Sequence, residues 1–288
     1  MPVDAFLMQA GLAGVLAGTG TGLLGAYIVA LRIPFIGICV AHAALAGAVA
    51  GSLLGWPLVP VSFAAAVIAA LALGAIDPER SRVDTNVLMS VLLSLTMGLA
   101  FLGIAGAGTS RNDLLALMWG NVLLCTGGDL AAMAAVTVVE LAFVLLFYKE
   151  LRAILFSRTH AAAAGVAAGV VWTLLLVLTA LVLTVHFKAV GGLMIYALLT
   201  NPALAAFQLA NGCGRCVALA AAFGALSGLG GFVVSYVADL PTGAVIVLFS
   251  SALVAVSALA GWWRRRRRPA ARSVEPAEPA RPARESDC

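Results

Sequence analysis

Very few side chains in the apolar part of this chain could carry chemistry. Glu140, in the segment AVTVVELAFVLL, is the only acidic residue well inside a long apolar stretch, and His42 lies inside another such stretch. His186 and Lys188 lie near the end of a third. A charge at the centre of a lipid-embedded helix costs about 2.5–3.5 kcal/mol on insertion scales, so it persists mainly where something compensates it. Glu140 is therefore either a proton or cation relay or a protonated interhelical group. His42 is either a ligand or a neutral histidine bonded to a backbone carbonyl.

The motifs of the common enzyme classes are missing. The dipeptide Gly-Lys does not occur, which removes the phosphate-binding P-loop. There is no His-Glu-x-x-His, no Gly-x-Ser-x-Gly and no cluster of carboxylates suited to hydrolysis. We expect a transporter or channel rather than an enzyme, with no cofactor on this chain and any ATP bound by another polypeptide.

The composition indicates whether water or lipid surrounds the folded chain. Of its 288 residues, 62% are hydrophobic and 10% are charged, with a mean hydropathy of +1.07. Soluble globular proteins carry about 25% charged residues. A chain so poor in charge cannot cover its surface against water, so lipid must surround most of it. The sequence predicts an all-α, polytopic transmembrane bundle.

Proline, turn and charge positions divide the apolar sequence into nine candidate spans. Eight spans and one re-entrant segment would fit nearly as well, and breaks are expected near Asn201-Pro202 and the glycines at 228–231. The nine spans cover residues 5–31, 35–54, 58–76, 86–107, 129–148, 165–186, 190–210, 214–236 and 243–263.

The basic residues orient these spans. With the N-terminus outside, 15 of the 17 lysines and arginines fall in cytoplasmic segments, and only Arg111 and Lys188 fall outside. The orientation is therefore N-out and C-in. The run Arg264–Arg268 follows a tryptophan pair, as at a cytoplasmic membrane interface, so the positive charge indicates membrane and not nucleic acid. We divide the chain into a transmembrane bundle, 1–263, and a basic, then disordered, tail, 264–288.

The glycine spacing and a cysteine pair each allow a structural and a functional interpretation. Gly14, Gly18 and Gly22 repeat every four residues, and the pairs 165/169 and 224/228 repeat the spacing. Such stripes indicate packing within the bundle, with a dimer face as the alternative. Cys213 and Cys216 form Cys-Gly-Arg-Cys, which lacks a second half of a metal site and which we interpret as incidental.

The segment from 147 to 165, FYKELRAILFSRTHAAAAG, differs from the other loops. Apolar residues alternate with charges of both signs at helical spacing, which predicts a short amphipathic helix at the cytoplasmic surface. A protein groove is at least as good a partner for it as anionic lipid. The residues that would make this contact are Lys149, Glu150, Leu151, Arg152, Ile154 and Leu155.

Five segments in order resemble the membrane permease subunits of zinc/manganese/iron-type ATP-binding-cassette importers. They cover roughly residues 10–250, and each is weak alone. The segments are LLGAYIVALRIPFIGICVAHAALAG (23–47), MWGN (118–121), the 147–165 segment, VGGLMIYALLTNPALAA (190–206) and DLPTGAVIVL (239–248).

The resemblance implies how the chain would work. It implies a homodimer in a bacterial or archaeal plasma membrane, a separate cytoplasmic ATPase and an extracytoplasmic metal-binding protein. ATP binding and hydrolysis would drive alternating access, transmitted through a docking helix at about 149–161. The cargo would be a transition-metal ion of the zinc, manganese or iron class.

Departures from the family pattern concern the substrate site. The family has an aspartate four residues before its histidine, so that both face one site. Here Ile38 takes the aspartate position, His42 remains, and Cys39 lies on the same helical face. An imidazole with a thiol favours softer ions such as zinc or copper(I) over manganese. We therefore predict a transient metal site at His42 and Cys39. Ser157 stands where the docking segment usually has aspartate.

Two other classes remain open at the sequence level. One is a self-contained channel or secondary transporter that uses Glu140 as a relay. The other is a degenerate permease that keeps the fold and serves as a non-transporting scaffold, an alternative raised by the missing aspartate at position 38.

Overall fold

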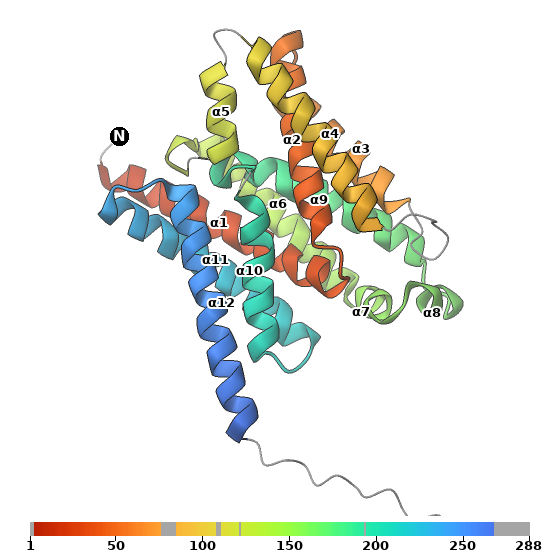
Figure 1. Ribbon diagram of the computed structural model, residues 1–288. Coiled ribbons are helices and arrows are strands. Elements are labelled where there is room, and N and C mark those ends of the chain that lie inside the picture. Colours follow the sequence, from red (N-terminus) through yellow and green to blue (C-terminus); the bar gives the residue numbers. More distant parts are fainter. Residues whose placement is uncertain (1–2, 76–84, 108–110, 121, 193, 268–288) are drawn as a thin grey trace, which may run out of the picture.

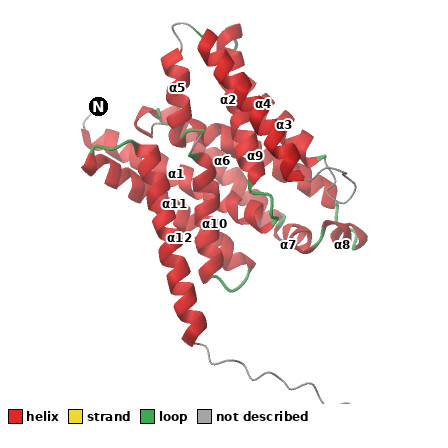
Figure 2. Ribbon diagram, viewed as in Figure 1, coloured by secondary structure: helices red, strands yellow, loops and turns green. Residues whose placement is uncertain are grey.

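The computed structural model describes residues 3–75, 85–107, 111–120, 122–192 and 194–267. Within these ranges the chain forms helices joined by short loops, with no strand (Figure 2). This agrees with the expected all-α bundle, because a backbone in lipid must satisfy its polar groups internally. The predicted disorder of the tail concerns residues outside the described part, apart from the basic run up to Arg267.

All nine expected spans are helices. Seven are long and apolar enough to cross a membrane, and α3 and α10 are shorter apolar helices. The nine are α1 (Val3–Ala30), α2 (Phe35–Leu54), α3 (Leu58–Gly74), α4 (Thr85–Gly106), α6 (Gly127–Leu146), α9 (Ala168–Val190), α10 (Ile195–Leu209), α11 (Cys213–Ala238) and α12 (Thr242–Arg267).

Several local expectations were wrong. Helix α10 continues through Pro202, and α11 continues through the glycines at 228–231, so neither helix is broken. Helix α12 includes the first arginines of the basic run instead of ending at 263, and the cation of Arg266 lies 3.9 Å from the ring centre of Trp262. A short helix, α5 (Arg111–Trp119), and a 3-10 turn, η2 (Val122–Leu124), precede α6 and were not expected.

The helices form two groups joined by α9 (Figure 1). Helix α2 packs against α3 and α4, whereas α10 and α11 pack against each other and against both α1 and α12. Helix α9 contacts α2 and α3 on one side and α1 and α6 on the other. The indole N–H of Trp172 on α9 donates to the carbonyl of Gly74 on α3 at 3.3 Å. Movement of α9 would therefore reach both groups.

The glycine stripe of α1 packs against α11 of the same chain. A Cβ atom at Gly14 would lie 2.8 Å from the carbonyl oxygen of Gly228, and one at Gly18 would overlap the carbonyl of Gly224. The helix backbones thus meet directly, as small residues allow in lipid. This confirms packing within the bundle and removes the dimer face as an interpretation of the stripe. The glycines at 165 and 169 have no such neighbour.

Replacing Gly18 by alanine tests the contact between α1 and α11. The added methyl group would overlap the backbone of Gly224, so the helices must separate, and overpacking of this kind costs about 1–3 kcal/mol. We expect the thermal unfolding midpoint of the detergent-purified protein to fall by several degrees. Gly98→Ala on α4 is the matched control, because nothing lies within 4 Å of its Cβ position. Equal midpoints for the two variants would contradict the proposed close contact.

Candidate functional site

His42 and Cys39 lie buried on α2, and each is held by a backbone carbonyl. The Nδ1 atom of His42 lies 2.9 Å from the carbonyl oxygen of Ile38, one turn earlier. Because a carbonyl can only accept, Nδ1 carries the proton, and Nε2 is left as the nitrogen able to bind a ligand. Metal-binding histidines are commonly oriented in this way, but so are structural ones. The structure thus shows His42 bonded to a backbone carbonyl, and metal binding by Nε2 stays a prediction.

The thiol of Cys39 has a structural partner. Its Sγ donates to the carbonyl oxygen of Met89 on α4 at 3.1 Å, and the side chain is fully buried. Metal binding requires a thiolate, so this hydrogen bond would have to be given up. Among the described residues, no group of three or more His, Cys, Asp or Glu side chains is placed to hold a metal ion. The metal site at His42 and Cys39 remains a prediction.

Glu140 is fully buried and lies away from this pair in the fold. It belongs to α6, which packs on α1 and α9, whereas His42 belongs to α2. Its Oε2 atom and the imidazole of His186 on α9 both lie near the Cβ position of Gly20 on α1, but no hydrogen bond joins the two groups. The sequence singled out both residues but gave no reason to pair them.

The segment that the charge pattern assigns to the cytoplasmic side forms two helices, α7 (Tyr148–Phe156) and α8 (Arg158–Ala163), and not the single helix expected for 149–161. The break is at Ser157, whose backbone is extended (φ −168°, ψ 129°). Its Oγ accepts a hydrogen bond from the backbone N–H of His160 at 3.3 Å, which caps α8. Serine and aspartate are both good N-caps, so the substitution at this position preserves the local structure.

Helix α7 buries one face and exposes another. Leu151 and Ile154 are buried, whereas Lys149 and Arg152 are exposed. Phe156, which the sequence analysis omitted, is 85% exposed at the end of α7. Glu150 and Leu155 are partly buried.

A cation–π contact fixes α8 to the next span. The guanidinium of Arg158 lies 4.3 Å from the ring centre of Trp172 on α9. Helix α6 leads into α7 with one intervening residue, and the rings of Phe143 and Phe147 lie 5.0 Å apart across this junction. The segment is thus attached to a span at each end.

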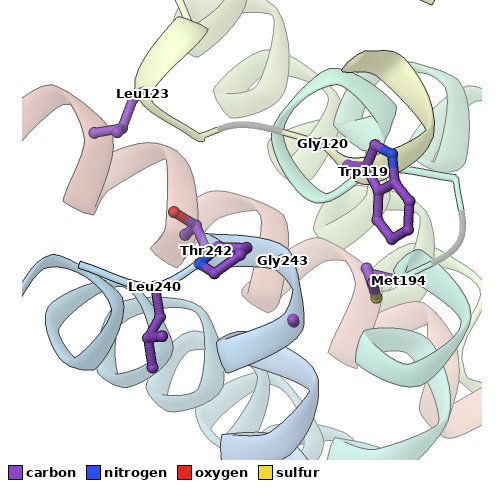
Figure 3. Close-up of a pocket in the computed structure, with 9 residues that line it drawn as sticks. Trp119, Gly120, Leu123, Met194, Leu240, Thr242 and Gly243 are labelled. Carbon is purple, nitrogen blue, oxygen red and sulfur yellow. The ribbon is translucent and has the colours of Figure 1, made fainter. Parts of the chain in front are cut away.

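A pocket of about 550 Å³ lies at the end of the bundle that the charge pattern assigns to the outside. Figure 3 shows Trp119 and Met194 on one side of it and Leu240 and Thr242 on the other. Three of the segments that carry the family resemblance meet here: 118–121, 190–206 and 239–248.

Glycines allow these three segments to meet. Gly120 (φ +68°) and Gly191 (φ +87°) adopt the left-handed backbone region, and a Cβ on either would overlap the other's segment. A Cβ at Gly243 would lie 2.6 Å from the carbonyl oxygen of Trp119. The motifs therefore mark a backbone-to-backbone junction that only glycine fits.

The ion pair beside this end joins α6 to α9. The Nζ of Lys188 lies 2.7 Å from Oδ2 of Asp129, and Asp129 also accepts from the backbone N–H and hydroxyl of Thr126. Lys188, the one described basic side chain assigned to the outside, is thus paired.

Cys213 and Cys216 are free thiols at the start of α11. Cys216 is buried and Cys213 is partly buried. They are not part of any group of three potential metal-binding side chains in the described ranges. The interpretation of this pair as incidental stays a prediction.

Comparison with known proteins identifies the class. The model of the ABC 3 transport family matches residues 3–261, nearly the whole described part of the chain. Together with the helical bundle, this shows that the chain belongs to that family, whose members are membrane permease subunits of ATP-binding-cassette transporters.

Individual relatives are similar over most of their length. The zinc transport system membrane protein TroC of Treponema pallidum is 32% identical over 282 residues, covering 92% of this chain and 94% of TroC. The manganese transport system membrane protein MntC of Halalkalibacterium halodurans is 30% identical over 253 residues, covering 88% and 86%. The solved structure of PsaBC from Streptococcus pneumoniae in complex with Fab superposes with a TM-score of 0.79 at 25% identity, covering 88% of this chain and 90% of that chain.

The cap at Ser157 can be tested by substitution. Ser157→Ala removes the acceptor for the N–H of His160, and loss of such a cap costs about 1 kcal/mol. We expect faster hydrogen–deuterium exchange in 158–163, whereas Ser157→Asp, which retains an acceptor, should exchange like the unmodified protein. Equally fast exchange in both variants would show that the hydroxyl does not cap α8.

The role of His42 can be separated from that of Ile38. His42→Ala removes the ligand nitrogen, and we expect zinc uptake into cells to fall by about tenfold or more, on the scale seen when metal-site residues are altered. Ile38→Ala keeps the backbone carbonyl that orients His42, so uptake should change little. Both are scored against the amount of protein in the membrane. Normal uptake by His42→Ala would remove this residue from the transport path.

Proposed function

We propose that this chain is the membrane permease subunit of an ATP-driven importer of transition-metal ions. The observation that carries the proposal is the match to the ABC 3 transport family over residues 3–261, joined to a separate amphipathic segment at α7 and α8. The relatives named for zinc and manganese transport support a divalent transition metal as cargo. Iron belongs to the wider class that the sequence resemblance implies.

The metal preference follows from the donor set at α2. Position 38 offers no carboxylate, and the nearby donors are the imidazole of His42 and the thiol of Cys39, whose hydrogen bond to Met89 would break on metal binding. Nitrogen and sulfur ligands suit zinc and copper(I) better than manganese. We therefore propose zinc as the favoured cargo. A homodimer and an extracytoplasmic metal-binding protein complete the proposed assembly, and they too rest on the family resemblance.

The proposed contact with the ATPase uses the exposed side of α7. Lys149, Arg152 and Phe156 are exposed there, while Leu151 and Ile154 hold the helix against the bundle. An aromatic side chain in a partner pocket, flanked by charges, is the arrangement that dominates the energy of many interfaces. ATP-driven closure of the partner would act on α6 and α9 through the two ends of this segment.

Two variants of α7 test this assignment. Phe156→Ala and Arg152→Glu should each reduce co-purification of the cognate ATPase and lower metal uptake, because an anchoring aromatic residue contributes about 2 kcal/mol or more to an interface. Phe101→Ala is the control, since Phe101 is 44% exposed on the apolar span α4. Membrane insertion should be the same for all three.

Two outcomes would contradict the proposal. Unchanged uptake and co-purification in both α7 variants would contradict docking at this segment. Metal uptake by the purified chain in vesicles without ATP or ATPase would instead select the self-contained transporter.

A further inference from the structure

Three helices bring together two fully buried polar side chains that the proposed function does not use. Glu140 on α6 and His186 on α9 are both 0% exposed. A Cβ built on Gly20 of α1 would lie 3.2 Å from Nε2 of His186 and 3.3 Å from Oε2 of Glu140. The two atoms therefore cannot be farther apart than the sum of these distances, and Gly20 places no side chain at that point.

Three atoms of these two side chains have no hydrogen-bond partner, and the two groups are not hydrogen-bonded to each other in the structure. Both carboxyl oxygens of Glu140 and Nε2 of His186 lack a hydrogen bond. A backbone group of Leu24 lies beside the carboxyl group, and one of Leu16 lies beside the imidazole. A buried polar atom without a hydrogen bond costs free energy, so three such atoms on two neighbouring side chains need an explanation.

The protonation of the imidazole follows from its second nitrogen. Nδ1 of His186 lies 2.7 Å from the carbonyl oxygen of Val182, so Nδ1 carries the proton and donates it. In the neutral ring, Nε2 then has a lone pair and needs a donor. A protonated carboxyl group has one O–H to give.

The charges around the pair favour its neutral form. On α6 and α9 the other charged residues are Asp129 and Lys188, and these pair with each other at 2.7 Å. On the part of α1 near Gly20 there is no titratable side chain before Tyr27, and α10 contributes only Tyr196. No cation among the described residues neutralises a Glu140 carboxylate, and an unpaired buried charge is far more costly than a protonated acid.

We propose that Glu140 and His186 form a buried proton-binding site, in which the carboxylic acid of Glu140 donates to Nε2 of His186 across the space left by Gly20. The ligand of this site is a single proton, and its two protein groups come from the helices attached to the two ends of the docking segment. The pair thus fastens α6 to α9 on the inside of one protomer.

The proposal can be tested without a transport assay. In the purified full-length protein, reconstituted in lipid at neutral pH, infrared spectroscopy should detect the C=O stretch of a hydrogen-bonded carboxylic acid. Glu140→Gln should abolish this band. His186→Phe should shift it to higher wavenumber, because the acceptor is gone, and His160→Phe on the exposed part of α8 should leave it unchanged.

A second measurement needs no variant and guards against misfolding. The chain has three histidines, so ¹⁵N-histidine solid-state NMR of the unmodified protein can resolve them individually. We expect His186 to be neutral, with the proton on Nδ1 and Nε2 accepting a hydrogen bond. A doubly protonated imidazole beside a carboxylate would overturn the proposal in favour of an ion pair. A Glu140 band that does not respond to His186→Phe in a folded variant would also overturn it.

Discussion

Close backbone contact between helices is the constraint on which this structure depends. Lipid removes the hydrophobic force that brings helices together in water, so packing must hold the bundle. Along α1 and α11 the small residues let backbone meet backbone at Gly14 and Gly18. At the pocket, Gly120, Gly191 and Gly243 let the ends of α5 and α9 and the start of α12 meet in the same way. Both contacts position the spans that carry the polar residues.

Packing against the bundle also holds α7 and α8, the segment proposed to bind the ATPase. Helices α7 and α8 are short, and an isolated helix of such length is marginal in water. Their order depends on the buried side chains of Leu151 and Ile154, the cap at Ser157 and the contact of Arg158 with Trp172. A force on this segment would pass to α6 and α9 rather than deform the segment itself, provided that the partner grips its exposed side.

The sequence predicted the spans well because their signal is physical and local. Long apolar runs in a chain with few charges must be helices, and the nine predicted ranges match nine helices within a few residues. It predicted the breaks poorly. Pro202 stays within α10, since such positions are tolerated in membrane helices when neighbours satisfy the backbone. It missed the break at Ser157 because alanine-rich and charged residues continue the helical pattern across it.

The candidate sites were less accessible to prediction because they depend on contacts between distant segments. His42 and Glu140 could be singled out from their residue types alone. The proximity of Glu140 to His186 could not, because it arises where α6 and α9 both pack against α1 at Gly20. The pocket is a similar case, since its lining comes from three motifs separated by dozens of residues. The motifs were visible in the sequence, but their common role as glycine contacts was not.

The two buried histidines show how the neighbour of one nitrogen determines what an imidazole can do. His42 and His186 each have Nδ1 bonded to the carbonyl four residues earlier, at 2.9 and 2.7 Å. This shared arrangement leaves Nε2 as the reactive atom in both. Beside His186 stands a carboxyl group that can supply a proton, whereas position 38, one turn before His42, holds isoleucine and not an acid. The two rings thus share one orientation and differ in their surroundings: a carboxyl group lies near Nε2 of His186, whereas the predicted metal site at His42 has no acid at position 38.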